Sequence, residues 1–118
     1  MNPTLKPLVF LGSSQDDLRG FPPAVRHALG VELMRVQFGG EPTDCKPMPT
    51  VGSGAYEVRI QIEGAWRAIY VAKFEAAIYV LHAFQKKSKT GRETPRRDIE
   101  LIKQRLREAE RIAKEMMA

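Results

Sequence analysis

Hydrophobic and polar side chains alternate along residues 56–63, which is the period-two pattern of a strand with one buried face. Segment 66–73 is apolar on much of both faces, and segment 78–84 has the composition of a central strand. Gly64 lies in a short turn between the first two segments. The pattern therefore predicts three strands joined as an antiparallel meander.

The segment before this meander has a different period. An apolar run at 8–11 predicts a buried strand, and residues 14–38 predict a pair of helices. The two prolines at 22 and 23 separate the helices, because proline has no amide donor and clashes with the preceding helical turn. The second helix carries one apolar stripe at spacings of three and four, formed by Val25, Leu29, Leu33 and Val36.

Two further segments complete the chain. Residues 41–54 contain three prolines and two glycines and predict a loop, whereas residues 95–117 repeat apolar side chains at spacings of three and four. The latter pattern predicts an amphipathic helix. The expected order is β-α-α-β-β-β-α. We interpret residues 1–118 as a single α+β domain, with the helices on one face of an antiparallel sheet.

Composition is ordinary for a globular domain, with 43% apolar and 28% charged residues among 118. Cys45 is the single cysteine, which excludes an intramolecular disulfide and disfavours a cysteine-based zinc site. No apolar run approaches the length of about 20 residues that a membrane span needs, and the N-terminus lacks the layout of a signal peptide. We therefore expect a cytoplasmic protein.

Charge is distributed unevenly along the chain. The formal net charge is +5, and all of the excess lies in residues 86–118, because residues 1–85 carry eight basic and eight acidic side chains. Such a basic block favours an anionic partner, with nucleic acid first. The alternative is a solvated loop and helix face that keeps the protein in solution.

The sequence lacks the common catalytic motifs. It contains no phosphate-binding loop, no dinucleotide fingerprint and no serine nucleophile elbow, and we expect neither a metal nor a cofactor. RNA, however, supplies its own nucleophile in the 2′-hydroxyl. Cationic side chains can stabilise the charge that develops on the phosphate, and one acid or base can move the proton. A small basic domain can therefore cut RNA and leave a cyclic phosphate.

Several segments together resemble one known family. They are the runs 56–60, 66–70 and 80–87, the last of which has the pattern Leu-His-x-Phe-x-Lys-Lys. Phe21-Pro22, a Gln-Phe-Gly segment before residue 40 and Thr94-Pro95 before the final helix extend the likeness to about residues 7–112. The chain resembles the phage-derived, HigB-like branch of the RelE/ParE toxin superfamily.

This resemblance implies a RelE-like fold and the toxin of a type II toxin–antitoxin system, typically a ribosome-dependent mRNA endoribonuclease. The expected partners are a cognate antitoxin, often a helix-turn-helix protein, together with mRNA and the ribosome, and a homodimer is possible. The antitoxin, or a second copy, would bind the final helix or the N-terminal helix pair. The alternatives are a ParE-like inhibitor of DNA gyrase and a catalytically silent nucleic-acid-binding module.

The resemblance also implies site residues. Those expected to be catalytic are Arg59, Arg67, His82 and Lys87. Those expected to bind RNA are Phe84, Lys86, Lys89 and Arg92. The two arginines would hold the scissile phosphate, and His82 or a lysine would act as acid or base. The best-known members use a tyrosine or histidine near the C-terminus, which this chain lacks, so the general acid is unassigned.

Three structural questions remain open from the sequence. A two-residue turn near Gly64 would place Arg59 and Arg67 on opposite faces of the sheet, whereas a three-residue loop or a bulge would align them. Glu57 either pairs with a basic residue of a neighbouring strand or takes part in catalysis. His82 is either a catalyst or a packed, hydrogen-bonded histidine.

Overall fold

The computed structural model describes residues 5–87 and 94–117 of the chain. The elements, in chain order, are β1 (Leu8–Phe10), α1 (Ser14–Arg19), α2 (Pro23–Gln37), β2 (Cys45–Pro47), β3 (Ala55–Gln61), β4 (Ala65–Val71), β5 (Ile78–Lys86) and α3 (Arg96–Met116). The predicted α+β class is confirmed, as are the helix pair, the meander and the final helix. No helix within the described ranges is both long enough and apolar enough to cross a bilayer.

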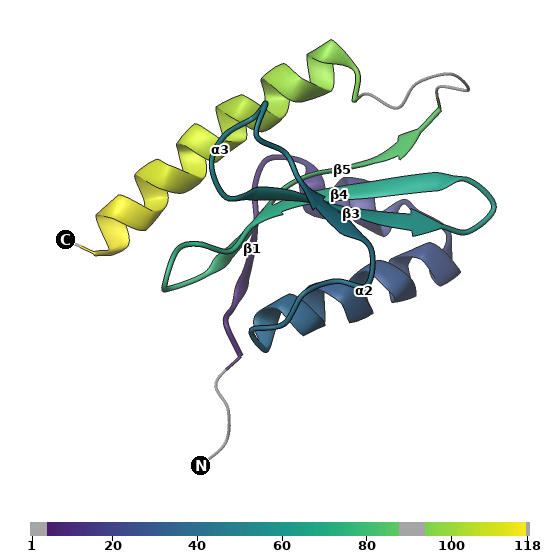
Figure 1. Ribbon diagram of the computed structural model, residues 1–118, viewed down its shortest axis with the longest axis horizontal. Helices are drawn as coiled ribbons and strands as arrows, with labels where there is room; N and C mark the ends of the chain where they lie inside the picture. The colour runs from purple at the N-terminus through teal and green to yellow at the C-terminus, as the bar shows by residue number, and fades with distance from the viewer. Residues whose placement is uncertain (1–4, 88–93, 118) are drawn as a thin grey trace.

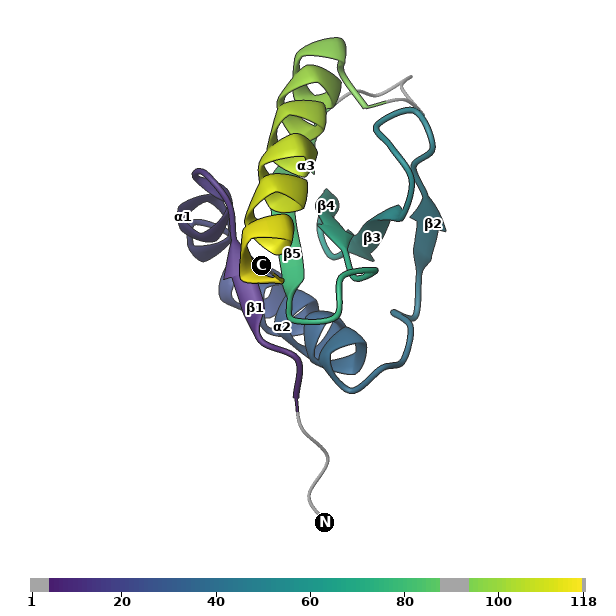
Figure 2. The same ribbon diagram turned by 90° about the vertical axis from the view of Figure 1, so that its left-hand side faces the viewer.

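The sheet has the strand order β1-β5-β4-β3-β2 (Figure 2). β1 runs parallel to β5 and the other neighbours are antiparallel, so the sheet is mixed rather than purely antiparallel as predicted. β1 is an edge strand with half-buried residues, which corrects the prediction of a buried strand. β2 lies inside the predicted loop 41–54. It escaped prediction because three residues ending in a proline carry no periodic signal.

Helices cover both faces of the sheet, so the prediction of helices on one face is wrong. α2 lies on one side and α3 on the other (Figure 1). The α2 side is packed with Val25, Leu29, Val36, Val58, Ala68, Tyr70 and Ile78. The α3 side is packed with Ile69, Val71, Tyr79, Leu81, Ile102, Leu106 and Ala109. The physical reason is visible in β4 and β5, whose side chains are apolar on both faces and need two covering layers.

A polar network around Arg105, near the middle of α3, fastens this helix to the sheet. Arg105 donates hydrogen bonds to the carbonyl of Leu81 at 2.8 Å and to the hydroxyl of Ser13 at 3.2 Å. Its guanidinium lies against Gly12, where an added Cβ would stand 2.5 Å from it. Gly12 also has φ +54°, a conformation that favours glycine. Glycine therefore suits this position for two reasons: it leaves room for the guanidinium, and it adopts the positive φ.

Candidate nucleic-acid interface

The α3 side of the sheet carries a second group of residues, in addition to those packed against the apolar side chains of α3. In an antiparallel pair, directly opposite residues face the same side of the sheet. Arg59 of β3 is opposite Arg67 of β4, which in turn is opposite Phe84 of β5. Lys86, two residues after Phe84, lies on the same side. The structure therefore brings four of the predicted site residues onto one surface.

The loop between β3 and β4 decides this alignment. Gln61 pairs with Ala65, so three residues, 62–64, form the connection. Glu63 has φ +46° and Gly64 has φ +138°, and the amide of Ile62 donates to the carbonyl of Gly64 at 3.1 Å. Of the two alternatives that the sequence left open, the three-residue loop is the one observed, and both arginines face the α3 side.

Glu57 is a buried carboxylate at the centre of this surface, with 3% of its surface exposed. Its Oε1 lies 3.8 Å from Nζ of Lys46 on β2 and 3.7 Å from Nε of Arg67 on β4. Its Oε2 accepts a hydrogen bond from the hydroxyl of Thr94 at 3.4 Å. The predicted pairing of Glu57 with basic residues of neighbouring strands is confirmed. We call Lys46, Arg59, Arg67 and Lys86 the cationic patch.

Charges within the cationic patch influence one another. Burial lowers the pKa of Lys86, and the nearby positive charge of Arg67 lowers it further. Arg59 instead pairs with Asp44, whose Oδ1 accepts from Nε at 2.9 Å and lies 2.8 Å from Nη2. Four cations and the two carboxylates of Glu57 and Asp44 leave this surface with a net positive charge. Such a surface attracts a phosphate.

His82 has partners inside the protein at both ring nitrogens. Its Nε2 lies 2.8 Å from Oδ1 of Asp98, and its Nδ1 lies 3.4 Å from Nη1 of Arg105. A guanidinium only donates, so the network assigns an accepting Nδ1 and an Nε2 that donates to Asp98. The side chain is 8% exposed and its ring stacks on Phe84 with the centroids 5.0 Å apart. This geometry favours the hydrogen-bonded histidine over the catalyst.

The remaining predicted residues lie elsewhere. Lys87 is exposed just after β5 and lies outside the cationic patch, but it lines a depression beside α1 that His82 and Phe84 also line. Lys89 and Arg92 fall outside the described residues. Among residues 5–87 and 94–117, no three histidine, cysteine, aspartate or glutamate side chains converge as metal ligands.

A protein-family comparison decides the assignment of the chain. Residues 16–107 match the family described as phage-derived protein Gp49-like (DUF891), and the match includes every strand from β2 to β5. The chain belongs to the Gp49-like family. This is a RelE/toxin-like family, which agrees with the α+β fold. A search of curated proteins found no match.

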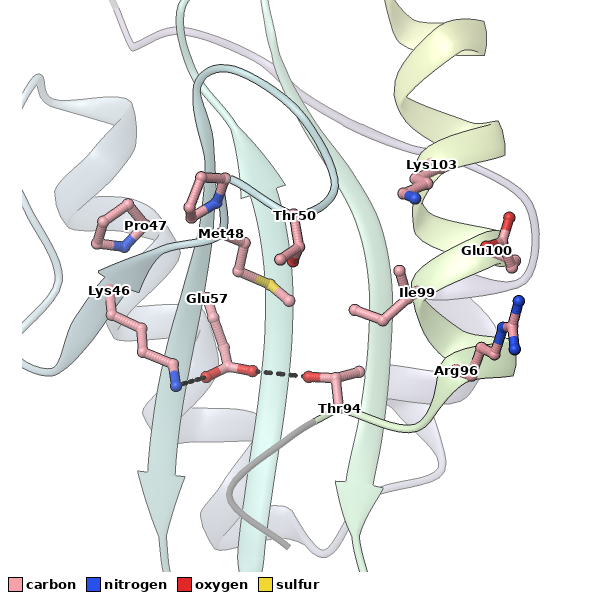
Figure 3. Close-up of a pocket in the computed structure, with 11 residues that line it drawn as sticks. Lys46, Pro47, Met48, Thr50, Glu57, Thr94, Arg96, Ile99, Glu100 and Lys103 are labelled. Atoms are coloured by element: carbon pink, nitrogen blue, oxygen red, sulfur yellow. Dashed lines mark hydrogen bonds and ion pairs between the residues drawn. The ribbon is translucent and has the colours of Figure 1, made fainter.

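Sequence reasoning missed part of the surface of this Gp49-like chain. A cleft of about 670 Å³ lies between segment 46–50 and the first two turns of α3 (Figure 3). We call it the α3 cleft. Its lining includes Lys46, Glu57, Arg96 and Lys103. The basic block at 86–118 indicated that α3 belongs to a binding surface. Nothing in the sequence indicated Lys46, because only the pairing of β2 with β3 brings Lys46 to this cleft.

Proposed function

We propose that this Gp49-like protein is the toxin of a type II toxin–antitoxin system, from the HigB-like branch of the superfamily. In this proposal it cleaves mRNA on the ribosome without a metal ion. The observation that carries it is the opposed pair Arg59 and Arg67, beside Lys86. Like charges directly opposite each other destabilise a sheet, and a phosphate placed between them would remove the repulsion.

The proposed reaction uses the RNA's own 2′-hydroxyl. Its oxygen forms a bond to the adjacent phosphorus, the bond from phosphorus to the 5′-oxygen breaks, and a 2′,3′-cyclic phosphate remains. The hydroxyl proton leaves to solvent, and the departing 5′-oxygen gains a proton. Arg59 and Arg67 stabilise the extra negative charge of the transition state. Lys86 is the proton donor that we propose, because a lowered pKa suits an ammonium group to this step.

His82 has a positioning role in this proposal. Its bond to Asp98 and its stacking on Phe84 hold the aromatic ring beside Arg67. An aromatic ring at the edge of a cationic surface is a platform on which an RNA base can stack. Phe84 therefore remains in the proposed RNA site, and Lys87 lines the same depression as Phe84.

The proposed partner is a cognate antitoxin, and α2 offers a surface for it. Val31, Met34 and Phe38 are all exposed and follow one another at spacings of three and four from α2 into its C-terminal cap. Such a stripe is the part of an amphipathic helix that a partner would cover. Of the two surfaces expected to bind the antitoxin, the final helix and the N-terminal helix pair, this observation favours the helix pair.

The test is induced expression in bacteria with mapping of mRNA 5′ ends. Wild-type protein should arrest growth and produce new cuts inside translated frames, whereas Arg67→Ala should do neither. Arg111→Ala is the matched control, because Arg111 is exposed on α3 and pairs only with Glu108 and Glu115 in the described structure. Arrest without cuts would contradict the ribonuclease and point to gyrase. No arrest would contradict the toxin.

A further inference from the structure

The α3 cleft shares Lys46 with the cationic patch and is also lined by Glu57, which pairs with Lys46. The chemistry of the cleft differs from that of the patch. Met48 and Ile99 supply apolar surface within it, whereas Arg96 and Lys103 supply positive charge along α3 (Figure 3). This combination of apolar surface and cations suits a nucleotide, which has a flat base and an anionic phosphate. An RNA chain lying on the cationic patch could place a neighbouring nucleotide in the cleft.

Three side chains form a row along the edge of this cleft. Figure 3 shows Lys46, Glu57 and Thr94 in line, with the carboxylate in the middle. The partners described for this carboxylate lie at 3.4–3.8 Å from it, as the ion pairs with Lys46 and Arg67 and the Thr94 hydrogen bond show. Charge-assisted hydrogen bonds are typically about 2.7–2.9 Å long. The carboxylate oxygens therefore retain the capacity to accept shorter bonds.

The row has a defined order of donors and acceptors. The ammonium group of Lys46 donates, and the two oxygens of Glu57 accept. Guanine presents the complementary order along its Watson–Crick edge: O6 accepts, and N1–H and the 2-amino group donate. Where guanine has its two donors, cytosine has two acceptors, uracil has one acceptor, and adenine has an acceptor and a C–H group. The row has the hydrogen-bonding order of a cytosine edge.

We propose that the α3 cleft is a guanine-nucleotide subsite for the RNA substrate, an inference that rests on the proposed function. Glu57 accepts from N1–H and the 2-amino group, and Lys46 donates to O6. On the side of the carboxylate away from Lys46, the hydrogen bond from Thr94 holds the carboxylate in its orientation. The base contacts Met48 and Ile99, and the phosphate lies near Arg96 and Lys103. The cleft thereby gives the protein a preference for guanine next to the cleaved bond.

The test measures binding of GMP, AMP, CMP and UMP to the purified full chain by calorimetry. A well-placed pair of hydrogen bonds discriminates between bases by at least about fivefold, so GMP should bind at least about fivefold more tightly than each of the other three. Glu57→Gln should abolish this preference, because its amide replaces one acceptor with a donor. Glu100→Gln is the matched control, since Glu100 lines the same cleft from the exposed side of α3, and it should keep the preference.

Lys46→Met provides a second variant should Glu57→Gln fail to fold, because the Lys46 side chain is 45% exposed. It should weaken GMP binding more than AMP binding. Equal binding of all four nucleotides, no binding at millimolar concentration, or an undiminished preference in the folded variants would overturn the proposal. Mononucleotides contain no cleavable bond, so this result is independent of cleavage. Cuts in mRNA with no guanine preference in binding would leave the toxin proposal intact and remove the subsite.

Discussion

Removing the charge of Lys86 and removing the charge of Asp44, the partner of Arg59, should have opposite effects on RNA binding. Lys86 forms no ion pair with any residue that the structure describes, whereas Arg59 is held by Asp44 at 2.8 Å. Lys86→Met therefore deletes a cation that is available to RNA and keeps the length of its apolar stem. Asp44→Asn deletes the carboxylate that competes with RNA for Arg59. The first change should weaken RNA binding and the second should strengthen it.

The magnitude follows from the release of counterions. For single-stranded nucleic acid, each phosphate contact contributes about −0.7 to the slope of the logarithm of the association constant against the logarithm of the salt concentration. Lys86→Met should make this slope shallower by about 0.7, and Asp44→Asn should make it steeper by up to about 0.7. Over a fourfold rise in salt, each change alters the affinity relative to wild type by about threefold.

Fluorescence anisotropy with a short single-stranded RNA, over a series of salt concentrations, measures these slopes. Lys114→Met is the matched control, because Lys114 is an exposed lysine in the last turn of α3, whereas the α3 cleft is lined by the first two turns of that helix. Its slope should equal that of the wild type. The reasoning is refuted if Lys114→Met changes the slope as much as Lys86→Met does, or if Asp44→Asn weakens binding.

Three further predictions concern the fold and the cysteine. Ile102→Ala, at a fully buried position between α3 and the sheet, should lower the free energy of unfolding by about 2–5 kcal/mol in urea titrations, and a loss below about 1 kcal/mol would contradict the packing. Gly12→Ala should lower the melting temperature, because the residue has φ +54° and its Cβ would meet a guanidinium, whereas Gly30→Ala, in open space within α2, should raise the stability by about 0.5–1 kcal/mol. Burial raises the pKa of the Cys45 thiol, and the charges of Glu41 and Asp44 raise it further, so the neutral thiol is favoured and its alkylation rate should still be rising with pH above 9.0; a rate that levels off below that pH would contradict this environment.

Local periodicity was sufficient to predict most of the fold. The helix pair, the three long strands and the final helix each extend over enough residues for a period of two or 3.6 to be visible. The hydrophobic pattern gave the wrong burial for residues whose cover or partners come from a distant segment. Tyr56 lies in the predicted apolar set of β3 and is 39% exposed, whereas Glu57, predicted on the polar face, is 3% exposed. The salt bridge with Lys46 and the hydrogen bond from Thr94 explain this burial, and no local pattern contains them.

The candidate site was predictable in its residue types and only partly in its arrangement. The basic and aromatic residues of β3, β4 and β5 were visible in the sequence, but their common face depended on whether the loop at 62–64 had two or three residues. Glu63 adopts φ +46°, which a non-glycine residue rarely does, so the sequence favoured neither alternative. The partners of His82 were also hidden, because Asp98 and Arg105 are 16 and 23 residues away on α3.

The hydrophobic core explains why the two arginines stay opposed despite their like charges. Arg67 precedes Ile69 and Val71 on the same face of β4, and both of these are fully buried on the α3 side. A slip of one residue would move them to the α2 side and bring the charged Arg67 to that side, which is packed with apolar side chains. Burying the Arg67 charge among apolar side chains would cost several kcal/mol, whereas an opposed like-charge pair costs about 0.2–1 kcal/mol. The core therefore fixes the register against the electrostatic repulsion, and it holds both guanidinium groups on the α3 side of the sheet.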